Sequence, residues 1–92
     1  MSDRVSLRVS ITGRVQGVGY RDWTRDHAHG LGLHGWVRNE PDGSVSAVFS
    51  GPTAAVDRMI EACRTGPPAA RVDDIAIDIT DDAPHGPFEK RR

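Results

Sequence analysis

The change of hydrophobic period along the chain is the feature that limits its fold most strongly. Residues 5–13, VSLRVSITG, alternate strictly between apolar and polar side chains, as a strand with one buried face does. Large side chains then recur at steps of three and four residues, the spacing of one helix face: Tyr20, Trp23, His27 and Leu31. With the GLG stretch at residues 30–32 as a stop signal, this spacing predicts a helix over residues 21–31.

The rest of the chain repeats this order with one additional strand. Residues 33–39 and 44–51 are short β-rich runs joined by EPDG, a hairpin turn signal. Residues 51–66 carry a proline suited to the first helical position and an apolar stripe on one helix face: Val56, Met59, Ile60 and Cys63. From about residue 72, isoleucines alternate with polar or small residues, which predicts another strand.

The predicted order is therefore strand, helix, strand, strand, helix, strand. This βαββαβ order is typical of the ferredoxin-like α+β sandwich, a four-stranded antiparallel sheet with both helices on one face. Residues 88–92, FEKRR, leave open a fifth strand in the antiparallel sheet, for which Phe88 is the candidate anchor. The charges of residues 90–92 fit either a frayed, solvated tail or a weak fringe that attracts anions, and we favour the tail.

Length and charge exclude several function classes. A chain of 92 residues holds one domain, residues 1–92, with one core. The formal net charge of -1 offers no global field for nucleic acid or an anionic membrane, so we expect neither as a partner. The sequence has no signal-peptide pattern and no long apolar run, which predicts a cytoplasmic protein, and we expect a monomer. The single cysteine, Cys63, shares the apolar stripe of the second helix, so core packing explains it better than a nucleophilic role.

Residues 13–21, GRVQGVGYR, form a glycine-rich link between the first strand and the first helix. Backbone N–H groups at a helix start have no partner within the helix, and the helix dipole adds about half a positive charge there. Arg21 lies in or beside the first turn, where a cation is unfavourable by a few tenths to about 1 kcal/mol unless an anion shares the site. Such a link can hold a phosphate. By spacing alone, however, an ordinary glycine turn is the more common explanation.

A second stretch, GWVRN at residues 35–39, changes that balance. Together the two stretches resemble the signatures of the acylphosphatase family, G-x-V-Q-G-V-x-[FY]-R and G-[WFY]-V-x-N. The resemblance runs from the first to the fourth predicted strand and includes the DGSV hairpin and the SGP before the second helix. It implies the βαββαβ fold and hydrolysis of the carboxyl–phosphate bond of acyl phosphates to a carboxylate and inorganic phosphate. It also implies that no metal ion or organic cofactor takes part.

The resemblance further implies which residues carry the reaction. The motif arginine, Arg21, holds the phosphate together with backbone N–H groups of the loop residues Val15, Gln16, Gly17, Val18, Gly19 and Tyr20. The motif asparagine, Asn39, orients the attacking water. A carboxylate leaving group, whose conjugate acid has a pKa of about 4, departs without a general acid. Neither motif contains an obvious side-chain base, so we expect the water's proton to pass to a phosphate oxygen of the substrate or to solvent.

Other polar and aromatic residues have simpler interpretations. His27 faces inward on the first predicted helix and His29 does not, so HAH lacks the spacing of a helical metal pair and we expect no metal site. Trp36 either packs under a helix or lines the substrate site. Solvent exposure is the simplest expectation for a further group of polar residues: His34, His85, Asp73, Asp74, Asp78, Asp81 and Asp82.

Two rival hypotheses come from other function classes. An RNA-binding module of this fold needs paired aromatic residues on its central strands and a basic sheet face, whereas the first strand presents Ser, Arg and Thr outward. A regulatory module that keeps an acyl-phosphate or carbamoyl-phosphate pocket without useful turnover is the stronger alternative. The presence of both Arg21 and Asn39 favours catalysis.

Overall fold

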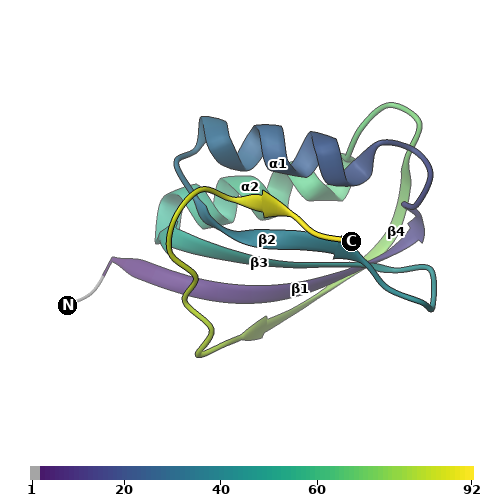
Figure 1. Ribbon diagram of the computed structural model, residues 1–92. Coiled ribbons are helices and arrows are strands. Elements are labelled where there is room, and N and C mark those ends of the chain that lie inside the picture. The colour runs from purple at the N-terminus through teal and green to yellow at the C-terminus, as the bar shows by residue number, and fades with distance from the viewer. Residues whose placement is uncertain (1–2) are drawn as a thin grey trace.

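The computed structural model describes residues 3–92, over which the chain forms five strands and two helices (Figure 1). In chain order these are β1 (Arg4–Arg14), α1 (Tyr20–Gly30), β2 (His34–Asn39), β3 (Val45–Pro52), α2 (Thr53–Thr65), β4 (Arg71–Ile79) and β5 (Glu89–Lys90). Both helices lie on one face of the sheet (Figure 1). The predicted ferredoxin-like βαββαβ order is confirmed.

The sheet has the strand order β4-β1-β3-β2-β5. The first four strands of the chain pair antiparallel, as predicted. β5 also forms, but it lies parallel to β2, so the expectation of an antiparallel fifth strand is wrong. The register explains the direction: the end of β4 at Ile79 lies level with Gly35 near the start of β2. After the long connection of residues 80–88, a strand that starts at this end of the sheet runs the same way as β2.

The core lies between the sheet and the two helices. Inward-facing residues of the strands and the apolar stripe of α2 are buried there, among them Val9, Ile11, Phe49, Val56, Met59, Ile60 and Cys63. Phe88 joins this core from the segment before β5: its side chain is 2% exposed, and its ring stacks on Phe49 with 5.5 Å between centroids. The prediction that Phe88 anchors the C-terminal segment is confirmed.

α1 begins and ends one residue earlier than predicted, and its inward face is different. Thr24 and Ala28 are buried together with Tyr20, whereas His27 is exposed and lies against Trp23 in a tilted arrangement with 4.2 Å between ring centroids. The prediction that His27 faces inward is wrong because the small side chains of Thr24 and Ala28 occupy the buried face of the helix. The Thr24 hydroxyl is satisfied there, since it donates to the Tyr20 carbonyl at 2.8 Å.

Trp36 packs on the sheet face that points away from the helices. Its side chain is 3% exposed, and the guanidinium carbons of Arg8, Arg38 and Arg91 lie 5.5, 4.8 and 5.0 Å from the ring centroid. Its indole N–H donates to Asp82 Oδ2 at 3.3 Å. Both expectations for Trp36 are wrong, because alternation along β2 turns the ring away from the core and stacked guanidiniums cover it instead.

Most residues expected to face solvent do so, and His34 is the exception. His34 is partly buried, and its Nδ1 donates to the carbonyl of Gly86 in the connection between β4 and β5. The remaining members of that group are exposed: His85, Asp73, Asp74, Asp78, Asp81 and Asp82. Neither helix within residues 3–92 has the length and apolar character needed to cross a membrane.

Candidate active site

The loop between β1 and α1 contains two glycines in left-handed conformations. Gly17 has a φ of 73° and Gly19 a φ of 80°, which glycine adopts without strain. Gly19 is also the N-cap of α1, and the first hydrogen bond of the helix runs from the Trp23 N–H to the Gly19 carbonyl at 3.0 Å. The N–H groups that precede Trp23 in the helix therefore have no partner within it, and they form the positive end of the helix dipole.

The start of α1 borders a pocket of about 230 Å³, lined from three parts of the chain. The loop and the first turn of α1, the end of β2, and β5 contribute Val15, Gly17, Gly19, Tyr20, Arg21, Asp22, Asn39 and Lys90. The pocket thus brings together Arg21 and Asn39, which sequence analysis expected to act on one substrate. Of the predicted phosphate loop, Gln16 and Val18 do not line the pocket.

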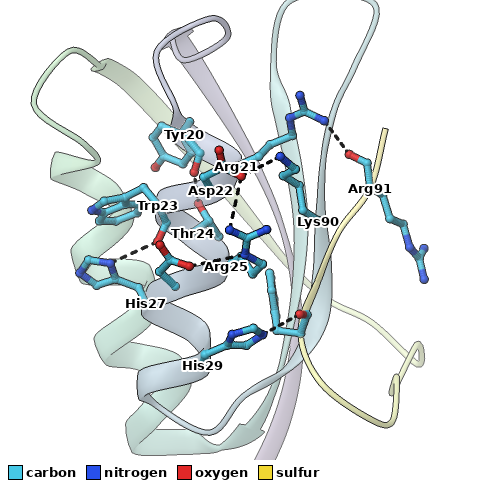
Figure 2. A network of polar contacts seen from close by, with 12 residues as sticks. Tyr20, Arg21, Asp22, Trp23, Thr24, Arg25, His27, His29, Lys90 and Arg91 are labelled. Atoms are coloured by element: carbon cyan, nitrogen blue, oxygen red, sulfur yellow. Dashed lines mark hydrogen bonds and ion pairs between the residues drawn. The ribbon is translucent and has the colours of Figure 1, made fainter.

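Arg21 is positioned by the C-terminal segment. Its Nη1 donates to the backbone carbonyl of Arg91 at 2.8 Å (Figure 2). Within residues 3–92, Arg21 makes no ion pair with a carboxylate. Its full positive charge therefore adds to that of the helix N-terminus, and this location favours an anion. Because a guanidinium does not deprotonate at working pH, it serves for binding and charge stabilisation and not for proton transfer.

The side chain of Gln16 joins the phosphate loop to the hairpin that carries Asn39. Its Nε2 donates to the carbonyls of Glu40 and Ser44, each at 2.8 Å. Asn39 ends β2 and directly precedes Glu40, so these bonds hold that strand end against the loop. Sequence analysis assigned Gln16 a backbone role only, and its side-chain role depends on carbonyls that the hairpin brings together. In the described part of the chain, the Asn39 side chain has no protein hydrogen-bond partner, which leaves its amide available to a ligand or water.

Lys90 and Asp22 form an ion pair in the pocket lining that sequence analysis missed. The Lys90 Nζ donates to Asp22 Oδ1 at 2.7 Å (Figure 2). The hydrogen bond and the charge of Lys90 lower the pKa of Asp22, with smaller contributions from the charges of Arg25 and Arg21. The expectation of a solvated tail is therefore wrong for Lys90. The pairing of β5 with β2 places it here, and a strand of two residues carries no periodic signal in the sequence.

Tyr20 connects the first turn of α1 to α2. Its side chain is buried, and its hydroxyl donates to the Cys63 carbonyl at 2.6 Å. Burial raises the pKa of the Tyr20 phenol well above its ordinary value, so it stays protonated near neutral pH. Burial also raises the pKa of the Cys63 thiol to about 12. This confirms the interpretation of Cys63 as a core residue, because the thiolate is the nucleophilic form.

The pocket lining carries more positive than negative charge. Arg21 and Lys90 are cations, and Asp22 is an anion paired with Lys90. Together with the helix N-terminus, this arrangement suits a phosphoryl group with two negative charges. Within residues 3–92, no group of three or more His, Cys, Asp and Glu side chains is placed to hold a metal ion.

Comparison with known proteins identifies the family of this chain. The sequence model of the Acylphosphatase family matches residues 7–90. The chain belongs to the acylphosphatase family. An acylphosphatase from Rhodospirillum rubrum is 61% identical to it over 72 residues, which are 78% of this chain and 79% of the relative. An acylphosphatase from Sinorhizobium medicae is 55% identical over 86 residues, which are 91% of this chain and 92% of the relative.

The same family relationship holds in three dimensions. The crystal structure of acylphosphatase from Bacillus subtilis is similar to this chain with a TM-score of 0.91 at 34% identity, covering 96% of this chain and 99% of that chain. The resemblance carried by the two motifs is confirmed, and the function of this chain is that of an acylphosphatase.

Proposed function

We propose that this acylphosphatase hydrolyses the carboxyl–phosphate bond of small acyl phosphates by direct attack of water, without a metal ion or organic cofactor. Arg21 and backbone N–H groups of residues 15–20 bind the phosphoryl group, and Asn39 orients the water. One observation supports these roles above all. Within residues 3–92, an arginine with no carboxylate partner and an asparagine amide with no protein partner line the same pocket at a helix N-terminus.

Binding of the phosphoryl group supplies most of the catalysis. Phosphoryl transfer spreads negative charge over three equatorial oxygens, so donors that are already in place stabilise the transition state without rearranging. Arg21 is held in this way, because the Arg91 carbonyl accepts one of its N–H groups at 2.8 Å. The remaining N–H groups of the guanidinium form a planar set that matches phosphate oxygens.

Asn39 suits the task of placing the water. A neutral amide both donates and accepts hydrogen bonds, so it fixes the orientation of a water molecule without adding negative charge beside the phosphate. The water oxygen attacks phosphorus in line with the bond to the acyl oxygen. As the new P–O bond forms, the bond to the acyl oxygen breaks, and its electron pair leaves with the carboxylate.

The proton of the attacking water passes to a phosphate oxygen of the substrate or to solvent. Asp22 brings a carboxylate to the pocket lining, but Lys90 lowers its pKa, which makes it a weaker base than an ordinary carboxylate. The departing carboxylate needs no proton, because its conjugate acid has a pKa of about 4. The reaction therefore needs neither a general acid nor a strong side-chain base.

We further propose that the enzyme acts as a monomer in the cytoplasm, with an acyl phosphate as its partner and inorganic phosphate as a product. Arg21 and Asn39 reach the same pocket from within a single chain, so their proposed roles require no residue from a second copy. The net charge of -1 supports the expectation that neither nucleic acid nor a membrane is a partner. Light scattering at the concentrations used for activity measurements tests the oligomeric state.

Phosphate release from acetyl phosphate and benzoyl phosphate, measured with a chelator present, tests the proposed reaction. We expect native turnover and a loss of at least about 100-fold in kcat for both Asn39→Ala and Arg21→Gln. Arg25→Gln is the matched control, because Arg25 lies on the next turn of α1 and does not line the pocket. Added phosphate should raise the Tm of the native protein and of Asn39→Ala, and should leave the Tm of Arg21→Gln unchanged.

Two results would contradict the proposal in different ways. Turnover that disappears in chelator and returns with an added divalent cation would exclude a metal-free reaction. No native turnover, with phosphate still raising Tm, would favour the regulatory module that binds acyl phosphates without hydrolysing them.

A further inference from the structure

The pocket lining contains a second cation, Lys90, that is held by Asp22. Figure 2 shows Lys90 reaching from β5 toward Asp22 on α1, beside the Arg21 side chain. All three residues line the pocket with Asn39. The ion pair is partly exposed to solvent on both sides, and pairs of this kind add little to folding stability. Its place in the pocket suggests a role in ligand binding.

We propose that Lys90 is a second phosphate-binding cation of this site and that Asp22 holds its ammonium group at the pocket until an acyl phosphate binds. The inference rests on the proposed function, since it assigns a further residue to the same phosphoryl site. A phosphoryl monoester group carries a charge of about -1.5 to -2 near neutral pH. Arg21 alone compensates one negative charge, and Lys90 supplies the second. Asp22 and the bound phosphoryl group then compete for Lys90.

The fold fixes the backbone of Lys90, so its place at the pocket does not depend on a fraying terminus. Phe88 is buried in the core two residues earlier, and Lys90 itself pairs with Val37 of β2. The Arg91 N–H donates to the Val37 carbonyl at 2.7 Å, and the Arg91 carbonyl accepts from Arg21 at 2.8 Å. Two adjacent residues of the C-terminal segment therefore position both cations.

Arg25 provides a control with the same charge and a shared partner. Its Nη2 lies 3.6 Å from Asp22 Oδ1, the oxygen that Lys90 also contacts, but Arg25 does not line the pocket. Removing either cation changes the net charge by the same amount. A difference in the Kd for phosphate between Lys90→Met and Arg25→Gln therefore reports on the position of the charge and not on the overall charge of the protein.

Titration of inorganic phosphate into the native protein and four variants tests the inference. We expect Lys90→Met to raise the Kd for phosphate about fivefold, which is about 1 kcal/mol, and to raise the KM for acetyl phosphate in parallel. Arg25→Gln should change the Kd by less than about twofold. Asp22→Asn should lower the Kd about twofold, because Lys90 loses its competitor, and this gain should disappear in Asp22→Asn/Lys90→Met.

Each alternative outcome has a definite meaning. A Lys90→Met protein that unfolds at the native urea midpoint and binds phosphate as tightly as the native protein would overturn the inference. An equal increase in the Kd for phosphate in Arg25→Gln would also overturn it, because the effect would then come from the overall charge of the protein. Native protein that binds phosphate but does not hydrolyse acetyl phosphate contradicts only the proposed function. Native protein that does not bind phosphate contradicts both.

Discussion

Replacing Gln16 by Met removes the contact that holds the strand end carrying Asn39 against the phosphate loop. The replacement keeps the length of the side chain. In the native protein, Gln16 Nε2 donates to the carbonyls of Glu40 and Ser44, each at 2.8 Å. These carbonyls flank the turn between β2 and β3, next to Asn39. Gln16→Met leaves both of them without this donor and lets the end of β2 move relative to the phosphate loop.

The expected loss of stability follows from those two hydrogen bonds. A hydrogen bond of this kind contributes about 0.5–1.5 kcal/mol, so the pair contributes about 2 kcal/mol to the free energy of unfolding. For a domain of this size, such a loss lowers Tm by roughly 8–16 °C. Thr12→Val is a suitable control: it removes a long, exposed hydrogen bond of 3.4 Å between Thr12 Oγ1 and the Asp74 carbonyl, away from the pocket.

The expected kinetic effect is larger on kcat than on phosphate binding. A displacement of Asn39 by about 1 Å is enough to lower kcat about 10- to 100-fold, since the water must lie in line with the breaking bond. Arg21 and the loop N–H groups remain, so the Kd for phosphate should change less than about threefold. Urea denaturation, acetyl phosphate kinetics and phosphate titration measure the three quantities. A native kcat in a destabilised Gln16→Met protein would refute the positioning role, and an unchanged Tm would refute the stability argument.

Three further predictions concern single groups. Gly19→Ala should lower the free energy of unfolding in urea by about 1–2 kcal/mol through its φ of 80° alone, because within the described residues an added Cβ meets no atom within 4 Å. The Cys63 thiol, with its pKa raised to about 12, should resist an aromatic disulfide reagent at pH 8 until the protein unfolds. The carboxyl of Asp22 should titrate by NMR below its ordinary pKa of 3.8, and Lys90→Met should return the pKa toward that value. Because the folded pKa is the lower one, the ion pair stabilises the protein above pH 3.8 and loses this effect as pH falls through the folded value.

The strands were predictable where one face of the sheet is buried and the other is not. The alternation in residues 5–13 places Val9 and Ile11 in the core, and β1 forms there as expected. α1 was harder, because its buried face carries Thr24 and Ala28, which have little hydrophobic signal, while Trp23 lies at its margin. Burial of small residues against a sheet depends on how closely the helix approaches, and periodicity does not show this distance.

The residues of the candidate site were likewise predictable only where the sequence signal is local. Arg21 and Asn39 were assigned because two local motifs resemble the acylphosphatase signatures, and the structure brings them to one pocket although they lie in different elements, α1 and β2. Lys90 was assigned to a tail because its position in the pocket depends on a parallel strand of two residues and on Phe88 entering the core. Long-range placement of this kind leaves no pattern near Lys90 itself.

The two functions of the pocket depend on separate long-range contacts. The C-terminal segment positions both cations. Its Arg91 carbonyl accepts a hydrogen bond from Arg21, and Lys90, which belongs to this segment, donates to Asp22. Gln16 instead positions the strand end that carries Asn39. Substitutions in β5 should therefore change mainly the affinity for phosphate, and substitutions of Gln16 should change mainly kcat. A double variant Gln16→Met/Lys90→Met should combine the two effects additively in free energy, because neither contact shares a partner with the other. Strong non-additivity in kcat/KM would show that one contact, and not two, holds the pocket together.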